Sequence, residues 1–171
     1  MAEQEFTDAI MLLRSDHEEV KSLFSQFEDA EGSENKRAIA EQICNELKVH
    51  SMIEEEIFYP ALRGQIEDDM LDEAVVEHDG AKVLINDIMS GGADEEFYDA
   101  KVKVLQEQIE HHVEEEEEAR EGMFAKARET DVDMKTLLEP MLARKQELMA
   151  QAESSGLPPA ELSAVDAEAT P

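Results

Sequence analysis

Apolar residues recur along this chain at alternating spacings of three and four, which is the period of a helix with one buried face. In the first such stretch Ile10, Leu13, Val20, Phe24 and Phe27 share the face. Three further stretches show the same period, and glycine or proline residues interrupt the pattern between them. We therefore predict four long helices over residues 8–28, 34–59, 68–90 and 94–128, the first of them capped by Thr7.

A fifth helix is predicted from Thr130, whose spacing to Asp133 resembles a capping box. Pro140 lies inside this stretch, so we expect a kink or a break there. After residue 153 the sequence is small, polar and rich in proline, with no run able to form a core. The sequence thus predicts one domain over residues 1–152 and a flexible tail over 153–171.

Short connections between successive amphipathic helices favour antiparallel neighbours. The predicted fold is therefore all-α: an up-and-down antiparallel four-helix bundle with an additional C-terminal helix and a tail. The predicted middles of the four helices lie near residues 18, 47, 79 and 111. Residues near these positions should meet at one level of the bundle.

One histidine stands on each of the four apolar faces, within about a turn of the middle of its helix. These residues are His17, His50, His78 and His112. Glu54 and Glu116 follow the second and fourth of them by four residues, a spacing that places both side chains on one helix face. Four imidazoles and two carboxylates are therefore predicted to converge in the bundle core.

Buried polar groups cost free energy unless they are partnered. A single inward histidine is most often a hydrogen-bonded core residue, and one histidine–glutamate pair can be a local ion pair. The six residues together favour metal ions, because imidazole and carboxylate both ligate transition metals. We predict His17 and His50 on one ion, His78 and His112 on a second, and Glu54 and Glu116 bridging the two.

Other polar residues near these motifs are not assigned to the predicted set of six ligands. His111 is assigned to the flank and kept, with Glu73, as a reserve ligand. Tyr59 and Tyr98 are expected to pack near the bundle ends. The remaining glutamates of the two acidic runs are expected to face solvent, namely Glu55, Glu56, Glu114, Glu115, Glu117 and Glu118.

Charge narrows the choice of partners. With 15 Lys and Arg against 44 Asp and Glu, the formal net charge is −29, a field that repels nucleic acid and anionic lipid surfaces. No apolar run approaches the roughly 20 residues that cross a bilayer, and the first residues lack the pattern of a signal peptide. We expect a cytoplasmic protein without nucleic-acid or membrane partners, as a monomer or a weak homo-oligomer.

The order of these motifs resembles the hemerythrin HHE cation-binding family: His17, then HSMIEEEIFYP, then EHDGAKVLI, then EHHVEEEEE. The resemblance covers about residues 8–128. It implies a non-haem di-iron centre, with two Fe ions bridged by carboxylates and an oxo or hydroxo group. It also implies that the protein binds O2 or a related small molecule for transport, sensing, storage or redox defence.

One departure from the oxygen-carrying members concerns the third helix. Those proteins have two histidines four residues apart there, whereas this chain has only His78, with Ala74 and Lys82 at the alternative places. They also have a longer spacing from the last histidine to an aspartate than the His112–Glu116 spacing here. Both irons would keep exchangeable positions unless Glu73, His111 or water fills one. Two alternatives therefore stand beside O2 binding: a redox enzyme acting on peroxide or NO, and an iron-responsive interaction module.

Overall fold

The computed structural model describes residues 5–166, and within them it contains helices and no strand. The two long N-terminal elements are α1 (Ala9–Asp29) and α2 (Ser33–Ile53). A π-helical turn (Glu54–Phe58) and the short α3 (Tyr59–Leu62) extend α2 without a gap. The later elements are α4 (Asp68–Ser90), α5 (Tyr98–Glu117), α6 (Met123–Arg128) and α7 (Met134–Ser154).

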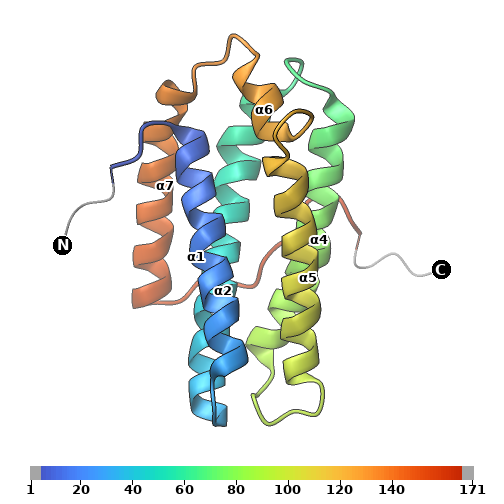
Figure 1. The fold of residues 1–171 in the computed structure, drawn as a ribbon. Helices are drawn as coiled ribbons and strands as arrows, with labels where there is room; N and C mark the ends of the chain where they lie inside the picture. Colours follow the sequence, from blue (N-terminus) through green and yellow to red (C-terminus); the bar gives the residue numbers. More distant parts are fainter. Residues whose placement is uncertain (1–4, 167–171) are drawn as a thin grey trace.

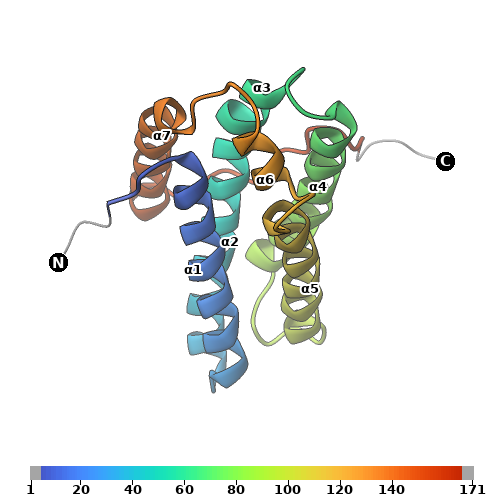
Figure 2. The ribbon, with the colours of Figure 1, turned by 45° about the horizontal axis from the view of Figure 1, so that its top comes forward.

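The helices α1, α2, α4 and α5 form the predicted up-and-down bundle, in which successive long helices run in opposite directions (Figure 1). The additional helix α7 packs alongside α1 and α2. Figure 2 shows α3 and α6 at the end of the bundle where α1 and α4 begin. No helix of the described part is both long and apolar enough to cross a membrane.

The apolar core is divided into two clusters along the bundle. One cluster contains Leu13, Ile53, Ala74 and Met123, together with residues of α7. The other lies toward the opposite end. On α1, α2 and α4 the predicted histidine falls between residues of the two clusters, and on α5 it follows the residues of the second cluster, so a buried polar layer separates two apolar ones.

The ends of α1 and α4 follow from local sequence. The α4 helix has the predicted bounds, Asp68–Ser90. The N-cap of α1 is Asp8 and not the predicted Thr7, because the Asp8 carboxylate accepts a hydrogen bond from the Met11 N–H at 3.0 Å.

The second predicted helix does not end at Pro60. The backbone N–H of Tyr59 bonds to the carbonyl of Glu54, five residues back, so one residue is inserted into the helical turn. Pro60 then stands in the first turn of α3, where proline is tolerated. The inserted residue rotates the following side chains. Phe58 and Tyr59 are therefore buried, whereas Ile57, which the unbroken period placed inward, is only half-buried.

The fourth predicted helix is two helices joined by a turn, and it begins at Tyr98 instead of residue 94. The α5 helix ends at Glu117. The Glu118 carboxylate then accepts hydrogen bonds from the N–H groups of Arg120 and Glu121. The turn is so tight that a Cβ on Gly122 would lie 2.4 Å from the Glu118 carbonyl oxygen. Gly122 is thus the residue that permits the turn, and not a weak point inside a long helix.

The predicted fifth helix begins four residues later than expected. Asp133 caps α7 by accepting a hydrogen bond from the Lys135 N–H, whereas the Thr130 hydroxyl bonds to the Ala127 carbonyl. Of the kink or break predicted at Pro140, the break is absent, because the helix continues through this residue. Pro140 is exposed, so the carbonyl that its missing N–H leaves without a partner can bond to water.

The tail is attached to α4 over part of its length. Asp79 is fully buried, and its carboxylate accepts hydrogen bonds from the N–H groups of Ser163, Ala164 and Val165 at 2.7–2.8 Å. Asn86 exchanges two hydrogen bonds with the backbone of Ala160. These contacts give the tail up to residue 166 a defined place, which its polar sequence does not indicate. Residues 167–171 of the predicted flexible tail lie outside the described part.

Candidate metal centre

The four predicted histidines meet in the polar layer of the bundle. Each is buried, with at most 7% of its surface exposed. The Nε2 atoms of His17 and His50 are 3.2 Å apart, and those of His78 and His112 are also 3.2 Å apart. Helices α1 and α2 thus supply one pair of imidazoles, and α4 and α5 supply the other.

The two predicted glutamates lie between these pairs. Glu54 Oε1 is 2.7 Å from His50 Nε2 and 3.4 Å from His78 Nε2. Glu116 contacts His112 Nε2 at 3.1 Å through Oε1 and His17 Nε2 at 3.3 Å through Oε2. Each carboxylate therefore contacts one histidine of each pair, which is the placement expected of a bridging group.

The other ring nitrogen of each histidine has a carboxylate partner on a different helix. His50 Nδ1 lies 2.9 Å from Asp16, and His78 Nδ1 lies 3.0 Å from Glu55. His112 and His17 have the corresponding contacts with Glu77 and Glu117, at 3.0 and 3.2 Å. An Nδ1–H that donates to a carboxylate leaves the lone pair on Nε2, directed into the centre.

These four outer carboxylates form a closed ring in chain order. Each helix holds the histidine of the next one, and Glu117 of α5 holds His17 of α1. Each outer carboxylate is also a sequence neighbour of an inner residue: Asp16 and Glu77 precede a histidine, whereas Glu55 and Glu117 follow a glutamate. The prediction that Glu55 and Glu117 face solvent is therefore wrong. That adjacency is the sequence signal that would have identified them.

Tyr59 belongs to the centre and not to a bundle end. Its hydroxyl donates a hydrogen bond to Glu116 Oε1 at 2.7 Å and lies 3.3 Å from His78 Nε2. Burial, Glu116 and Glu54 together raise the pKa of Tyr59 well above its ordinary value, so the phenol is neutral and donates. The prediction for Tyr59 failed because the π-helical turn rotates its side chain inward.

The electrostatics of the layer favour imidazolium–carboxylate pairs. Burial lowers the pKa of His50, but Glu54 and Asp16 outweigh burial and raise it to about 10. Burial raises the pKa of the Glu116 carboxyl, whereas His112 and His17 hold it well below its ordinary value. A cation bound here would replace these protons, since metal ligands must be deprotonated.

The oxygen atoms of Glu54 and Glu116 indicate which kind of ligand the site fits. Both carboxylate oxygens of Glu54 and Oε2 of Glu116 are buried without a hydrogen bond of acceptable geometry within the described part. Such atoms are rare in protein interiors and need an explanation. Two groups of ligand-type atoms, each lying within 4.8 Å of one another, share Glu116: one with His17 and His50, the other with Glu54, His78 and His112. This donor set of nitrogen and oxygen atoms suits transition-metal cations.

The two reserve ligands lie outside the buried layer. The His111 side chain is 64% exposed and contacts Glu77 and Glu115, and Glu73 is exposed. On α4, Ala74 has no donor atom, and the Lys82 ammonium is paired with Glu55 and Asp79. Helix α4 therefore contributes one histidine and no second nitrogen ligand to the layer.

A small cavity adjoins the four histidines on their inner side. Its volume is about 30 Å³, and its apolar wall includes Val20, Leu47, Ala81, Ile85 and Ile109. This volume accommodates a water molecule or a diatomic molecule. The centre therefore has room for a small exogenous ligand beside its polar atoms.

Fold and site together define a helical bundle with a histidine–carboxylate site for metal cations. The sequence profile of the Hemerythrin HHE cation binding domain matches residues 8–127, which is most of the chain. The chain belongs to this family of metal-binding domains. The resemblance seen in the sequence is thereby confirmed.

A solved structure shows the same fold. The crystal structure of a hemerythrin HHE cation binding domain-containing protein from Mycobacterium kansasii is similar, with a TM-score of 0.72 and 23% sequence identity. The similarity covers 89% of this chain and 96% of that one. A comparison with curated proteins found no match.

Proposed function

We propose that this protein is a non-haem di-iron protein that binds O2 or a related small molecule, such as NO or peroxide. The observation that supports the proposal best is the arrangement of Glu54 and Glu116, each of which contacts one histidine of each pair. Six donors in two groups with shared carboxylates match two ions better than one. His17, His50, His78 and His112 would supply the nitrogen ligands.

The residues around the centre would act in distinct ways. The four outer carboxylates orient the imidazoles, so that the Nε2 atoms already point inward, and a cation that binds there would replace the protons on them. Iron bound at the centre would supply electrons to the small molecule. The 30 Å³ cavity, whose wall is partly apolar, has room for a ligand of only a few atoms. Tyr59 holds a proton on its hydroxyl at the edge of the layer and donates it in a hydrogen bond to Glu116.

A second candidate is a redox enzyme that consumes peroxide or NO at the same centre. The single histidine on α4 favours this candidate, because Lys82 is held by ion pairs and Ala74 cannot ligate. Fewer nitrogen ligands leave more positions open to exchange. Assays of turnover separate the two candidates, since a carrier returns its ligand unchanged and an enzyme converts it.

The decisive experiment is metal analysis joined to visible spectroscopy. Protein purified without oxygen should contain close to two irons per chain and should gain visible absorption bands when O2 is added. The His112→Ala protein, which lacks one inner nitrogen, serves as the control and should gain none. An iron content far below two per chain, with no spectral response in the unaltered protein, would overturn the proposal.

A further inference from the structure

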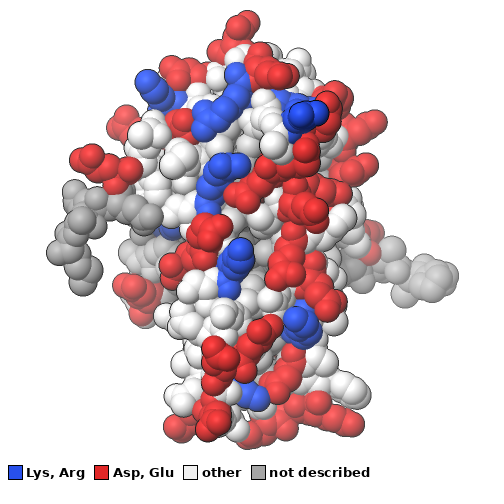
Figure 3. Space-filling view, viewed as in Figure 1, with Lys and Arg blue, Asp and Glu red and all other residues white. Residues whose placement is uncertain are grey.

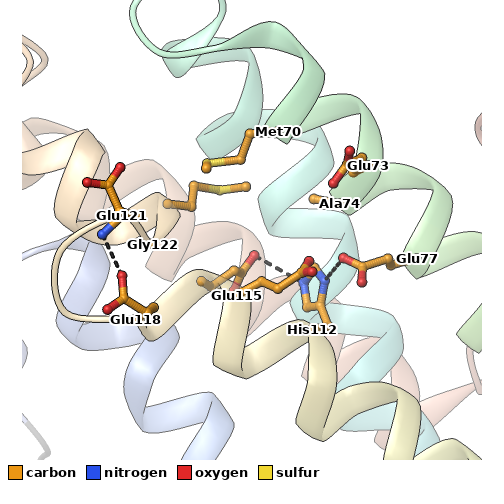
Figure 4. Close-up of a pocket in the computed structure, with 11 residues that line it drawn as sticks. Met70, Glu73, Ala74, Glu77, His112, Glu115, Glu118, Glu121 and Gly122 are labelled. Carbon is orange, nitrogen blue, oxygen red and sulfur yellow. Dashed lines mark hydrogen bonds and ion pairs between the residues drawn. The ribbon is translucent and has the colours of Figure 1, made fainter.

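A second, larger hollow reaches the centre from outside, between α4 and α5. Its volume is about 380 Å³, and it lies against the turn that precedes α6 (Figure 4). His112 and Glu116 contribute to its lining together with glutamates of α4, α5 and the turn. This hollow, which we call the acidic cleft, joins the buried layer to the protein surface.

The lining of the acidic cleft carries negative charge without any Lys or Arg. Five of its residues are glutamates outside the inner layer: Glu73, Glu77, Glu115, Glu118 and Glu121. In Figure 4 Glu73 and Glu77 come from α4 and Glu115 from α5, on the two sides of the cleft. A concave surface lined by one sign of charge concentrates ions of the opposite sign. The acidic cleft therefore attracts cations toward His112.

Glu77 and Glu115 of the cleft wall both contact His111, and these three residues together could hold a cation in transit. His111 Nε2 lies 3.2 Å from Glu115 Oε1 and 3.4 Å from Glu77 Oε2, and ligand atoms of these three residues lie within 4.8 Å of one another. The other oxygen of Glu77 holds His112 Nδ1 at 3.0 Å. Glu77 thus belongs both to the exposed set and to the ring that supports the buried layer.

A buried carboxylate of the centre lies at the inner end of the cleft. Glu116 is 1% exposed and lines the cleft. Its Oε2 is buried, with His17 Nε2 at 3.3 Å and no hydrogen bond of acceptable geometry in the described part. The exposed glutamates alone would be ordinary surface charge. Their connection to this buried carboxylate leads from solvent to the centre.

We infer that the acidic cleft is the entrance through which divalent cations reach the buried centre, with Glu77, His111 and Glu115 as the transient binding point. This inference rests on the proposed function, since it assumes that the centre takes up metal. It adds a role for His111, which the buried layer does not use.

A second groove provides the matched control. It runs between α1 and α5, also reaches His17, and is lined by Glu18, Glu110, Glu114 and Glu117 together with Lys21. Glu114 is the sequence neighbour of Glu115 on α5, and both are exposed. Double changes in the two grooves can therefore remove equal charge, including one of two adjacent glutamates of α5 in each case.

The experiment measures how fast Co²⁺ enters the metal-free protein, using the visible absorption of bound cobalt in stopped flow. The Glu73→Gln/Glu115→Gln and His111→Ala proteins should load about threefold to tenfold more slowly than the unaltered protein and reach the same final ratio of cobalt to protein. The Glu110→Gln/Glu114→Gln protein should load at the unaltered rate. The difference should shrink at high salt, which screens exposed charge.

Two results would overturn the inference. Equal loading rates in all proteins would exclude the cleft as the entrance, and slow loading only in the Glu110/Glu114 protein would place the entrance between α1 and α5. Circular dichroism checks that each variant is folded. If the unaltered protein binds no cobalt and no iron, the proposed function itself fails, an outcome distinct from either of these.

Discussion

Two adjacent histidines of α5 have opposite environments. His112 is buried with its Nε2 in the centre, whereas the His111 side chain is 64% exposed. Their separation follows from the rotation of about 100° per residue in a helix. The same substitution at His111 and at His112 therefore tests the site assignment, because the two variant proteins have identical composition.

Replacing His112 or Glu54 by Ala should lower iron loading strongly, and replacing His111 should leave the final loading unchanged. Outer partners of metal ligands typically contribute about tenfold to a hundredfold in affinity, so loss of an inner donor should cost at least that much. The effect is measured as the iron content of each protein after equilibration with a chelator that competes for a limited amount of iron. Equal losses from His111→Ala and His112→Ala would contradict the assignment.

The hydroxyl of Tyr59 is a second single-residue test. The Tyr59→Phe change keeps the buried ring and removes the donor to Glu116. Hydrogen bonds to charged groups contribute about 1.5–3 kcal/mol, so the free energy of unfolding should fall by that amount. Urea unfolding measures it, and Tyr98→Phe is the control because Tyr98 is buried in the apolar cluster away from the centre. An equal loss in both proteins would argue against a special role for Tyr59.

Single residues also show what the sequence could and could not predict. The period of apolar residues placed His17, His50, His78, His112, Glu54 and Glu116 in one layer, because a side chain on the buried face of a regular helix must point inward. Their role as ligands stays a prediction. The outer partners were missed because Asp16, Glu55, Glu77 and Glu117 point sideways, toward a neighbouring helix. A pattern along one helix does not specify what the next helix presents.

At the scale of elements, prediction failed where the helical period itself changes. The π-helical turn adds one residue between Glu54 and Tyr59, and Glu118 to Gly122 form a tight turn inside a run that reads as helix. Both features depend on backbone hydrogen bonds, which composition does not reveal. The α4 helix has no such interruption, and its bounds were predicted correctly.

The turn before α6 can be tested with two glycines. Gly122→Ala should destabilise the protein by more than about 1 kcal/mol, because the new Cβ would lie 2.4 Å from a backbone oxygen that cannot move freely. Gly80→Ala should instead stabilise it by up to about 1 kcal/mol, since Gly80 is exposed within α4 and a Cβ there meets nothing within 4 Å. The free energies of unfolding of the two variants are compared by urea unfolding, with all proteins at the same metal content. Stabilisation by Gly122→Ala would refute the account of the turn.

At the scale of the whole molecule, the segment beyond the family match contacts the ring of outer carboxylates. The Lys145 ammonium of α7 pairs with Asp16, and the Ser163 hydroxyl of the tail bonds to Glu55. Through these two residues the C-terminal part contacts the partners of His50 and His78. On the face seen in Figure 3, acidic side chains form dense rows over α5.

Attachment of the tail should depend on Asp79. In the Asp79→Ala protein the N–H groups of Ser163, Ala164 and Val165 lose their acceptor, so the tail should leave α4 more often. Cleavage within residues 155–166 by a nonspecific protease should become about tenfold faster or more, because one charge-assisted hydrogen bond alone contributes about 1.5–3 kcal/mol. Mass spectrometry locates the cuts. The control is the Asp87→Ala protein, which loses an exposed partner of Lys101 and should be cleaved at the rate of the unaltered protein. Unchanged cleavage of the Asp79→Ala protein would show that the tail is held by other contacts.

The ring of outer carboxylates also bears on the handedness of the bundle. Four helices joined by short loops can turn around the bundle axis in either sense. The outer carboxylate stands one residue before an inner residue on α1 and α4, and one residue after an inner residue on α2 and α5. Because these helices alternate in direction, the alternating offset turns all four carboxylates in the same sense around the axis. In the mirror-image arrangement each carboxylate would face the preceding helix instead of the next one, so the order of pairing in the ring reports the sense in which the four helices turn around the axis.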